Sequence, residues 1–325
     1  MGANATGKTA LGKVLMGIFN FINKKNSDHI TKLINNPNKE ASFIIDFAYS
    51  NNRLVRVETI INSKKDITKE YSINDIKVVV KEEQILQHDN YEKCISRLIN
   101  NKALQADSYI EALEKVPPLS WKFEYPFASS GRQQAIRTLN TELFGQVLEK
   151  TLKALDPRIQ KVTSLPNIDN AFGIFRDNDV ILIEDGKVIN PEKLSSGTVE
   201  GIGIADIVSA MILRAHDFYY CDEKFSHIHS DPEKAFLSLF IELLGPDEQM
   251  IFTSHNSDVL EMDLPKHSFA FMRRDPVDNT VSCVYASDYL KKNTISLKNA
   301  VENDLFGSSP DLSKIYEIEE SRVEQ

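Results

Sequence analysis

The sequence predicts an α/β fold organised around a phosphate-binding loop, and three observations lead to this prediction. Residues 2–9 read Gly-Ala-Asn-Ala-Thr-Gly-Lys-Thr, which matches the pattern G-x-x-x-x-G-K-[ST]. Between residues 198 and 272, helical patterns alternate with short apolar strands, as in parallel βα units covered on both faces. One of these strands is followed at once by Asp222 and Glu223. We therefore expect a mixed central sheet with helices on both faces.

The N-terminal part is predicted to contain one amphipathic helix and an antiparallel lobe. The helix follows the loop directly, because apolar residues recur at helical spacing there, at Leu11, Val14, Leu15, Ile18, Phe19 and Ile22. Apolar and polar side chains alternate at 43–49, 55–61 and 76–80, which predicts antiparallel strands. Residues 83–115 are polar with a helical pattern, and Pro117 and Pro118 end it.

The remaining elements are predicted from the same two periodicities and from turn residues. They are an aromatic stretch at 121–127, a helix at 133–155, strands at 172–175 and 180–184, a turn at Asp185-Gly186 leading to 187–189, a helix at 198–214, a strand at 218–221, a helix at 232–244, and strands at 250–253 and 269–272. The acidic tail at 317–325 is expected to fray.

Composition excludes several classes of protein. Of 325 residues, 42% are hydrophobic and 26% charged, which excludes collagen-like, mostly disordered and disulfide-scaffold proteins. The net charge of −9 argues against nucleic-acid binding through a bulk positive field, although a local basic groove stays possible. We find neither a signal peptide nor an apolar run long enough to span a membrane. Three cysteines without paired spacing fit a reducing compartment, so we expect a cytoplasmic protein.

The loop residues are expected to bind a nucleotide. Gly2 and Gly7 let backbone N–H groups turn toward phosphate oxygens at the start of a helix, with Asn4 between them. Lys8 would reach the β- and γ-phosphates, and Thr9 would place its hydroxyl on Mg²⁺. The alternative is an ordinary glycine-containing turn before a helix.

The acidic pair supplies what a nucleotide hydrolase needs opposite a phosphate loop. Asp222 would hold Mg²⁺, and Glu223 would polarise the attacking water as a catalytic residue. Taken alone, the pair could be a solvated turn. A second alternative is a transition-metal site formed by Glu223, His227 and His229.

Two further segments are candidates for phosphate contacts. Ser195 and Gly197 lie where a helix begins, so N–H groups there could face an anion, or the segment could be an ordinary N-cap. His255 follows the strand at 250–253, at the strand end where ligands sit in open α/β sheets. It could hydrogen-bond a γ-phosphate, or it could be a structural histidine.

The order of these motifs resembles an ABC-type ATPase head, in particular the SMC-like and OLD-like AAA-family ATPases of prokaryotes. The resemblance implies that Gly2, Gly7, Lys8 and Thr9 form the Walker A loop, Ser195 and Gly197 the signature, Asp222 and Glu223 the Walker B pair, and His255 the switch histidine. It also implies that two heads bind ATP between them, with the signature of one covering the phosphate loop of the other.

Two departures from this pattern concern the contacts to ATP. The signature has Ser196 where the family usually has glycine, and Thr198 where it usually has glutamine. The glutamine of the Q-loop has three candidates, Gln84, Gln87 and Gln133, and their spacing does not decide among them.

The resemblance implies one head with an inserted lobe. Residues 1–82 would form its N-terminal part, 83–160 an inserted, mostly helical lobe, and 161–325 its C-terminal part. We expect an ATP-dependent homodimer that hydrolyses ATP slowly and signals to a protein effector encoded nearby, plausibly in phage defence. The alternatives are a DNA-repair ATPase that binds duplex DNA directly and a nucleotide-gated adaptor that barely hydrolyses ATP.

The position of the loop in the chain leads to one more expectation. A phosphate loop normally follows a buried strand, but Gly2 follows the first methionine directly. Either the natural chain starts upstream, or this chain lacks that strand and its ATP binding is impaired.

Overall fold

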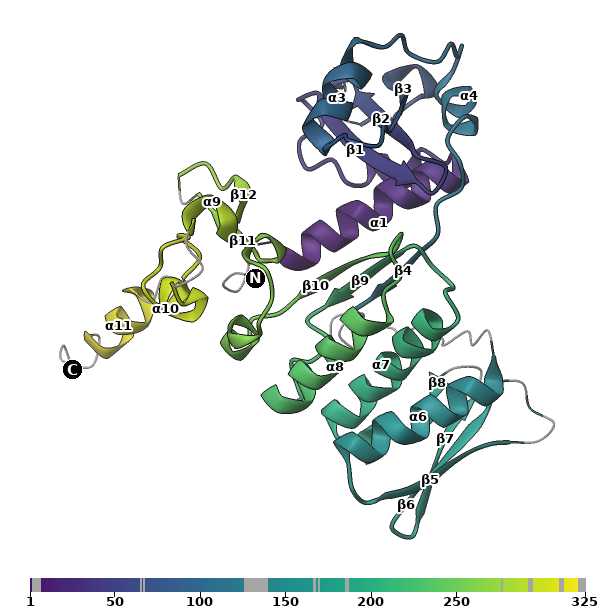
Figure 1. The fold of residues 1–325 in the computed structure, drawn as a ribbon, viewed down its shortest axis with the longest axis vertical. Helices are drawn as coiled ribbons and strands as arrows, with labels where there is room; N and C mark the ends of the chain where they lie inside the picture. Colours follow the sequence, from purple (N-terminus) through teal and green to yellow (C-terminus); the bar gives the residue numbers. More distant parts are fainter. Residues whose placement is uncertain are drawn as a thin grey trace. The chain divides into compact units, whose positions relative to one another are not determined.

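The computed structural model describes residues 1, 7–64, 66, 68–125, 140–165, 168, 170–184, 187–275, 277–291, 295–309 and 313–320. It divides into two compact units (Figure 1). The larger unit comprises Met1–Leu11 and Lys122–Gln325, and the smaller unit comprises Gly12–Trp121. Helix α1 (Lys8–Lys24) begins in the larger unit and continues into the smaller one. The predicted division of the head into residues 1–82, 83–160 and 161–325 stays a prediction.

The smaller unit is an α/β lobe around an antiparallel sheet. Strands β1 (Ala41–Tyr49), β2 (Arg53–Ile61) and β3 (Ile76–Gln84) pair in chain order. This confirms the three predicted strands, and each extends beyond the predicted bounds. The apolar face of α1 packs in this unit, where the ring of Phe19 lies 5.7 Å from that of Phe47. The short elements are α2 (Asp28–Thr31), η1 (Ile73–Asp75), α3 (Tyr91–Asn100) and α4 (Tyr109–Glu114).

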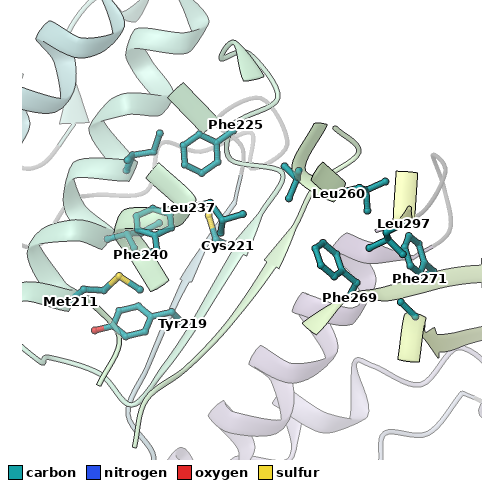
Figure 2. Packing of buried hydrophobic residues seen from close by; sticks show 14 of the residues in the cluster. Met211, Tyr219, Cys221, Phe225, Leu237, Phe240, Leu260, Phe269, Phe271 and Leu297 are labelled. Atoms are coloured by element: carbon teal, nitrogen blue, oxygen red, sulfur yellow. The ribbon is translucent and has the colours of Figure 1, made fainter. Parts of the chain in front are cut away.

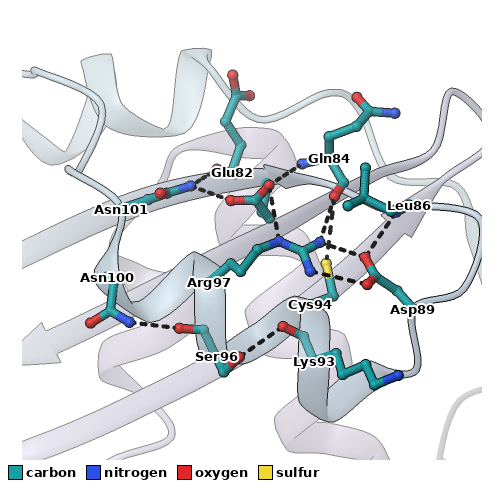
Figure 3. A network of polar contacts seen from close by, with 11 residues as sticks. Glu82, Gln84, Leu86, Asp89, Lys93, Cys94, Ser96, Arg97, Asn100 and Asn101 are labelled. Atoms are coloured by element: carbon teal, nitrogen blue, oxygen red, sulfur yellow. Dashed lines mark hydrogen bonds and ion pairs between the residues drawn. The ribbon is translucent and has the colours of Figure 1, made fainter.

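The prediction of a helical stretch over 83–115 was only partly right. β3 runs on to Gln84, and two separate helices follow. Polar contacts explain the interruption (Figure 3). Arg97 of α3 binds the carboxylate of Asp89 and donates to the carbonyl oxygen of Gln84 at 3.1 Å. Asn101 donates to the carbonyl oxygen of Glu82 at 3.0 Å. These bonds fasten the C-terminal part of α3, and Asp89 ahead of the helix, to the end of β3, so the segment does not form one straight helix.

The larger unit contains the βα alternation that the sequence predicts. Strands β9 (Phe218–Asp222) and β10 (Gln249–Thr253) are parallel, with Asp222 opposite Thr253. Helix α8 (Ser230–Leu243) connects them, and β4 (Trp121–Glu124) lies on the other side of β9. The predicted α/β fold is therefore confirmed.

The core of the larger unit lies beside β9 (Figure 2). Tyr219 and Cys221 point from β9 into a cluster that Met211 joins from helix α7 (Ser196–Ile212), and Phe240 from α8. Tyr220 points to the opposite face, where its hydroxyl donates to the carbonyl oxygen of Lys8 at 2.7 Å. Helices therefore lie on both faces of β9, and α1 begins on the Tyr220 side.

A second core lies between α7 and an antiparallel sheet. The sheet consists of strands β5 (Ile159–Ser164), β6 (Phe172–Arg176), β7 (Asp179–Glu184) and β8 (Lys187–Val188). Helix α6 (Thr141–Leu155) contributes to the same core. The sequence did not predict β5. Asn140 caps α6, so the predicted helix begins later than expected among the described residues, and 133–139 and the turn at 185–186 lie outside them.

The C-terminal region departs from the predictions at two places. Strand β11 (Ala270–Arg274) pairs antiparallel with β12 (Val281–Tyr285) rather than continuing the βα alternation, since a short turn suffices for a hairpin. Of the tail predicted to fray, residues 317–320 belong to helix α11 (Ser313–Glu320), and 321–325 lie outside the described residues. The other elements are η2 (Pro191–Lys193), η3 (Ser257–Glu261), η4 (Lys266–Ser268), α9 (Ala286–Tyr289) and α10 (Leu297–Glu302). In the described part of the chain, every helix is too short or too polar to span a bilayer.

Candidate functional site

The first turn of α1 and the end of β9 meet in the larger unit. The hydroxyl of Thr9 donates to Oδ2 of Asp222 at 2.6 Å, across 213 positions of sequence. The ammonium group of Lys8 lies 3.1 Å from Oε1 of Glu223. Lys8 is only 5% exposed and Asp222 is fully buried. Two charged segments predicted from separate motifs therefore form one buried cluster.

Thr253, at the end of β10, holds the acidic pair in place. Its hydroxyl donates to Oδ1 of Asp222 at 2.6 Å and accepts from the backbone N–H of Glu223 at 3.1 Å. Glu223 adopts a φ of +43°, a left-handed conformation that is unfavourable for a residue with a side chain of this kind. The parallel pairing of β9 and β10 thus fixes where both carboxylates point.

His255 lies at the edge of the same cluster. Its Nδ1 is 3.8 Å from Oε1 of Glu223, and its side chain is half-exposed. Gly7, at the start of α1, has a φ of +101°, which favours glycine. The described end of the loop therefore has the conformation that the glycine predicts.

A cavity of about 230 Å³ opens beside Glu223 and His255. Its wall includes Glu233 of α8, and only 2% of the surface of this residue is exposed. Glu233 accepts from the hydroxyl of Ser254 at 2.8 Å and from the amide of Asn256 at 2.6 Å. Part of the cavity wall is therefore formed by polar groups whose positions hydrogen bonds fix.

The predicted signature residues lie at the start of α7. Ser195 is the N-cap of this helix, and its hydroxyl accepts from the backbone N–H of Thr198 at 3.1 Å. A Cβ atom on Gly197 would lie 2.7 Å from the carbonyl oxygen of His227, so only glycine fits. Ser195 and Ser196 are exposed. Ser195 therefore acts as an ordinary N-cap, as the alternative interpretation expected, and the start of α7 is exposed.

Buried charges connect α7 with the segment that follows Glu223. Nζ of Lys224 lies 2.8 Å from a carboxylate oxygen of Glu200 and 3.6 Å from one of Glu124. Burial by itself lowers the pKa of Lys224, but these two carboxylates outweigh it, so the pKa lies above its ordinary value. Lys224 therefore stays charged inside the unit.

The structure brings together five of the predicted residues and separates others. Lys8, Thr9, Asp222, Glu223 and His255 form one cluster. Ser195 and Gly197 make their contacts elsewhere on the unit, and Gly2 and Asn4 lie outside the described residues.

The alternative metal site receives no support from the geometry. In the described part of the chain, no three His, Cys, Asp or Glu side chains are grouped as metal ligands, so Glu223, His227 and His229 form no such cluster.

Sequence reasoning missed three residues that order the cluster, namely Thr253, Tyr220 and Glu233. Thr253 had a signal, because polar residues cluster where β10 ends. Tyr220 and Glu233 sit within a strand and a helix, where nothing in the sequence marks an inward polar contact.

No protein-family model and no curated protein sequence matches this chain. Among solved structures it is similar to an SMC head bound to the C-terminal winged-helix domain of ScpA, at 14% identity and a TM-score of 0.51, covering 92% of this chain and 90% of that one. It is also similar to an SMC head with an extended coiled coil, bound to the C-terminal domain of ScpA from Pyrococcus furiosus, at 11% identity and a TM-score of 0.43, covering 93% and 90%. The first similarity shows that this chain has a fold like that of an SMC head.

Proposed function

We propose that this protein binds and hydrolyses ATP as an ABC-type ATPase head. One observation carries the proposal: the Thr9–Asp222 hydrogen bond and the Lys8–Glu223 ion pair place a cation, a hydroxyl and two carboxylates at the N-terminus of one helix. Phosphate-binding loops and acidic strand ends are combined in this way in nucleotide hydrolases. The fold similarity supports the same class.

Each side chain can be given a role. Lys8 and the N–H groups that begin α1 would bind the β- and γ-phosphates. Thr9 and Asp222 offer hard oxygen atoms 2.6 Å apart, which fit Mg²⁺ as shared ligands. When bound, Mg²⁺ would neutralise charge on the phosphates.

Glu223 and His255 are the proposed catalytic residues. Glu223 would accept a proton from the attacking water, since it lines the cavity. His255 would hydrogen-bond the γ-phosphate, and its half-exposed position leaves the imidazole accessible.

We further propose that ATP drives formation of a homodimer. The exposed helix start at Ser195 would cover the γ-phosphate bound to a second copy.

The similar SMC head binds a domain of ScpA, which supports the proposal that this head also acts on a protein partner. From the family resemblance alone, we propose that the partner is an effector encoded nearby and that the pair acts in phage defence.

The function is tested by phosphate release from ATP and Mg²⁺ by the wild type, Lys8→Ala and Glu223→Gln. We expect measurable turnover in the wild type only. Equal release by all three proteins would contradict hydrolysis, and with nucleotide binding intact it would favour the adaptor. A steep loss of duplex-DNA affinity with rising salt would instead favour the DNA-repair alternative.

A further inference from the structure

His255 is held from behind by a buried carboxylate on a different element. Its two neighbours in sequence, Ser254 and Asn256, both bond to Glu233, the first to Oε1 and the second to Oε2. His255 itself points away toward Glu223. One carboxylate on α8 therefore holds the side chains that flank the exposed imidazole on both sides in sequence.

Neighbouring hydrogen bonds fix the direction of both contacts to Glu233. Asn256 cannot reverse its amide, because its Oδ1 atom accepts from the backbone N–H of Asp258 at 3.0 Å and caps η3. The amide nitrogen must then face Glu233, and it also donates to the hydroxyl of Ser230 at 3.1 Å. On the other side, the oxygen of Ser254 accepts from the N–H of Asn256 at 3.0 Å, so its proton is directed to Glu233.

We propose that Glu233 is a positioning residue for hydrolysis, which holds the Ser254–Asn256 turn so that His255 stays beside Glu223 in the cavity. The inference rests on the proposed ATPase function. Glu233 is buried in the cavity wall, whereas the γ-phosphate is expected beside the Lys8–Glu223 ion pair. Its loss should therefore lower kcat and leave KM almost unchanged. A misplaced group of this kind costs up to about 100-fold in rate.

Two substitutions separate positioning from charge. Glu233→Met keeps the length of the side chain and removes both acceptors. Glu233→Gln removes the charge but keeps a contact at both positions: its oxygen can accept from Asn256, and its nitrogen can donate to the oxygen of Ser254, which reverses the direction of that bond. Positioning predicts that the Gln variant keeps most of the wild-type kcat and that the Met variant loses roughly 10- to 100-fold. An effect of charge alone predicts equal losses in both.

The experiment measures kcat, KM, nucleotide affinity and melting temperature for both variants, with Glu242→Met as a matched control. Glu242 is exposed on the same helix, so this variant loses one charge without touching the cavity. A Ser254→Ala background completes a double-mutant cycle, in which the effect of Glu233→Met should shrink because one of its two bonds is already absent.

The outcomes are distinct. Wild-type kcat in Glu233→Met overturns the inference while leaving the ATPase proposal intact. Equal losses in the Met and Gln variants also overturn it, in favour of an electrostatic effect. Absence of turnover in the wild type refutes the proposed function itself. A Met variant with reduced kcat, unchanged nucleotide affinity and rescue by Gln supports the inference.

Discussion

The ammonium group of Lys8 forms an ion pair with Glu223 at 3.1 Å, so the proposed phosphate ligand and the proposed general base neutralise each other. Lys8 is the more buried partner, whereas Glu223 is one-quarter exposed at the cavity. An incoming phosphate would compete with Glu223 for the ammonium group. Phosphate binding would thereby release the carboxylate toward the water it is proposed to activate.

Glu223→Gln should separate binding from hydrolysis. Loss of the carboxylate removes one competitor of the phosphate for the ammonium group of Lys8, and a gain on the order of 1 kcal/mol corresponds to about fivefold tighter nucleotide binding. Hydrolysis should fall by about 100-fold or more, because the general base is gone. Titration with a fluorescent ATP analogue and a phosphate-release assay measure the two effects. Weaker binding in this variant would show that the ion pair does not compete with the nucleotide.

Thr253→Val should destabilise the protein and slow hydrolysis together. Valine keeps the shape but removes the hydroxyl that joins Asp222 to the backbone of Glu223. The buried carboxylate loses a donor, which costs about 1–3 kcal/mol. Urea denaturation measures the change in unfolding free energy. Thr163→Val on β5 is the control, and we expect less than about 0.5 kcal/mol there. Equal costs at both positions would remove any special role for Thr253.

Ser195→Asp should abolish ATP-driven dimerisation without unfolding the head. Aspartate caps a helix as well as serine does, so α7 stays intact. The negative charge of the aspartate would repel the γ-phosphate of the ATP bound to the other copy. The matched control is Ser195→Asn, whose side chain is a neutral cap, and this variant should still dimerise. Mass measurement with and without ATP distinguishes them. Gly197→Ala is a poor test, because the added carbon would collide with His227.

Lys224→Met should cost about 3–5 kcal/mol of unfolding free energy, since it removes a buried cation that lies beside the buried carboxylates of Glu200 and Glu124. Lys122, 3.5 Å from Glu124, remains in the variant. Lys234→Met on α8 removes a lysine that pairs with the exposed Asp231, and it should cost no more than about 1 kcal/mol. Chemical denaturation of both variants provides the comparison. Similar midpoints would mean that the Lys224 pairs add nothing.

Stability of the smaller unit should fall in acid through Asp46. Burial by itself raises the pKa of Asp46, but hydrogen bonds from Arg56 and Tyr91 outweigh it, so the pKa lies below its ordinary value of 3.8. A carboxyl group whose pKa is lowered by folding stabilises the folded state fully at pH values above its ordinary pKa. This contribution is lost as the pH falls from the ordinary pKa through the lower pKa of the folded state. Denaturation curves of the wild type and Asp46→Asn should therefore differ most near neutral pH and converge below about pH 4. A constant difference at every pH would contradict this.

Local motifs were the most predictable part of this chain. Lys8, Thr9, Asp222 and Glu223 follow from short patterns, because the chemistry of each pattern requires those residue types at that spacing. The parallel pairing of β9 and β10 follows from the helix between them. By contrast, β12 was missed although four of its five residues, Val281, Cys283, Val284 and Tyr285, are apolar, because the run is short and largely exposed. Glu233 was missed because a carboxylate in the first turn of a helix usually faces solvent, and only the packing of α8 turns it inward.

The left-handed backbone of Glu223 has a consequence for protein engineering. Glycine or asparagine suits that conformation better than glutamate, so either substitution would relieve the backbone while removing the carboxylate. Where this gain exceeds the loss of the ion pair with Lys8, the melting temperature would rise. A redesign guided by thermal stability would therefore select against the residue that the proposed reaction most needs. At this position, a more robust variant and an active one are expected to be different molecules.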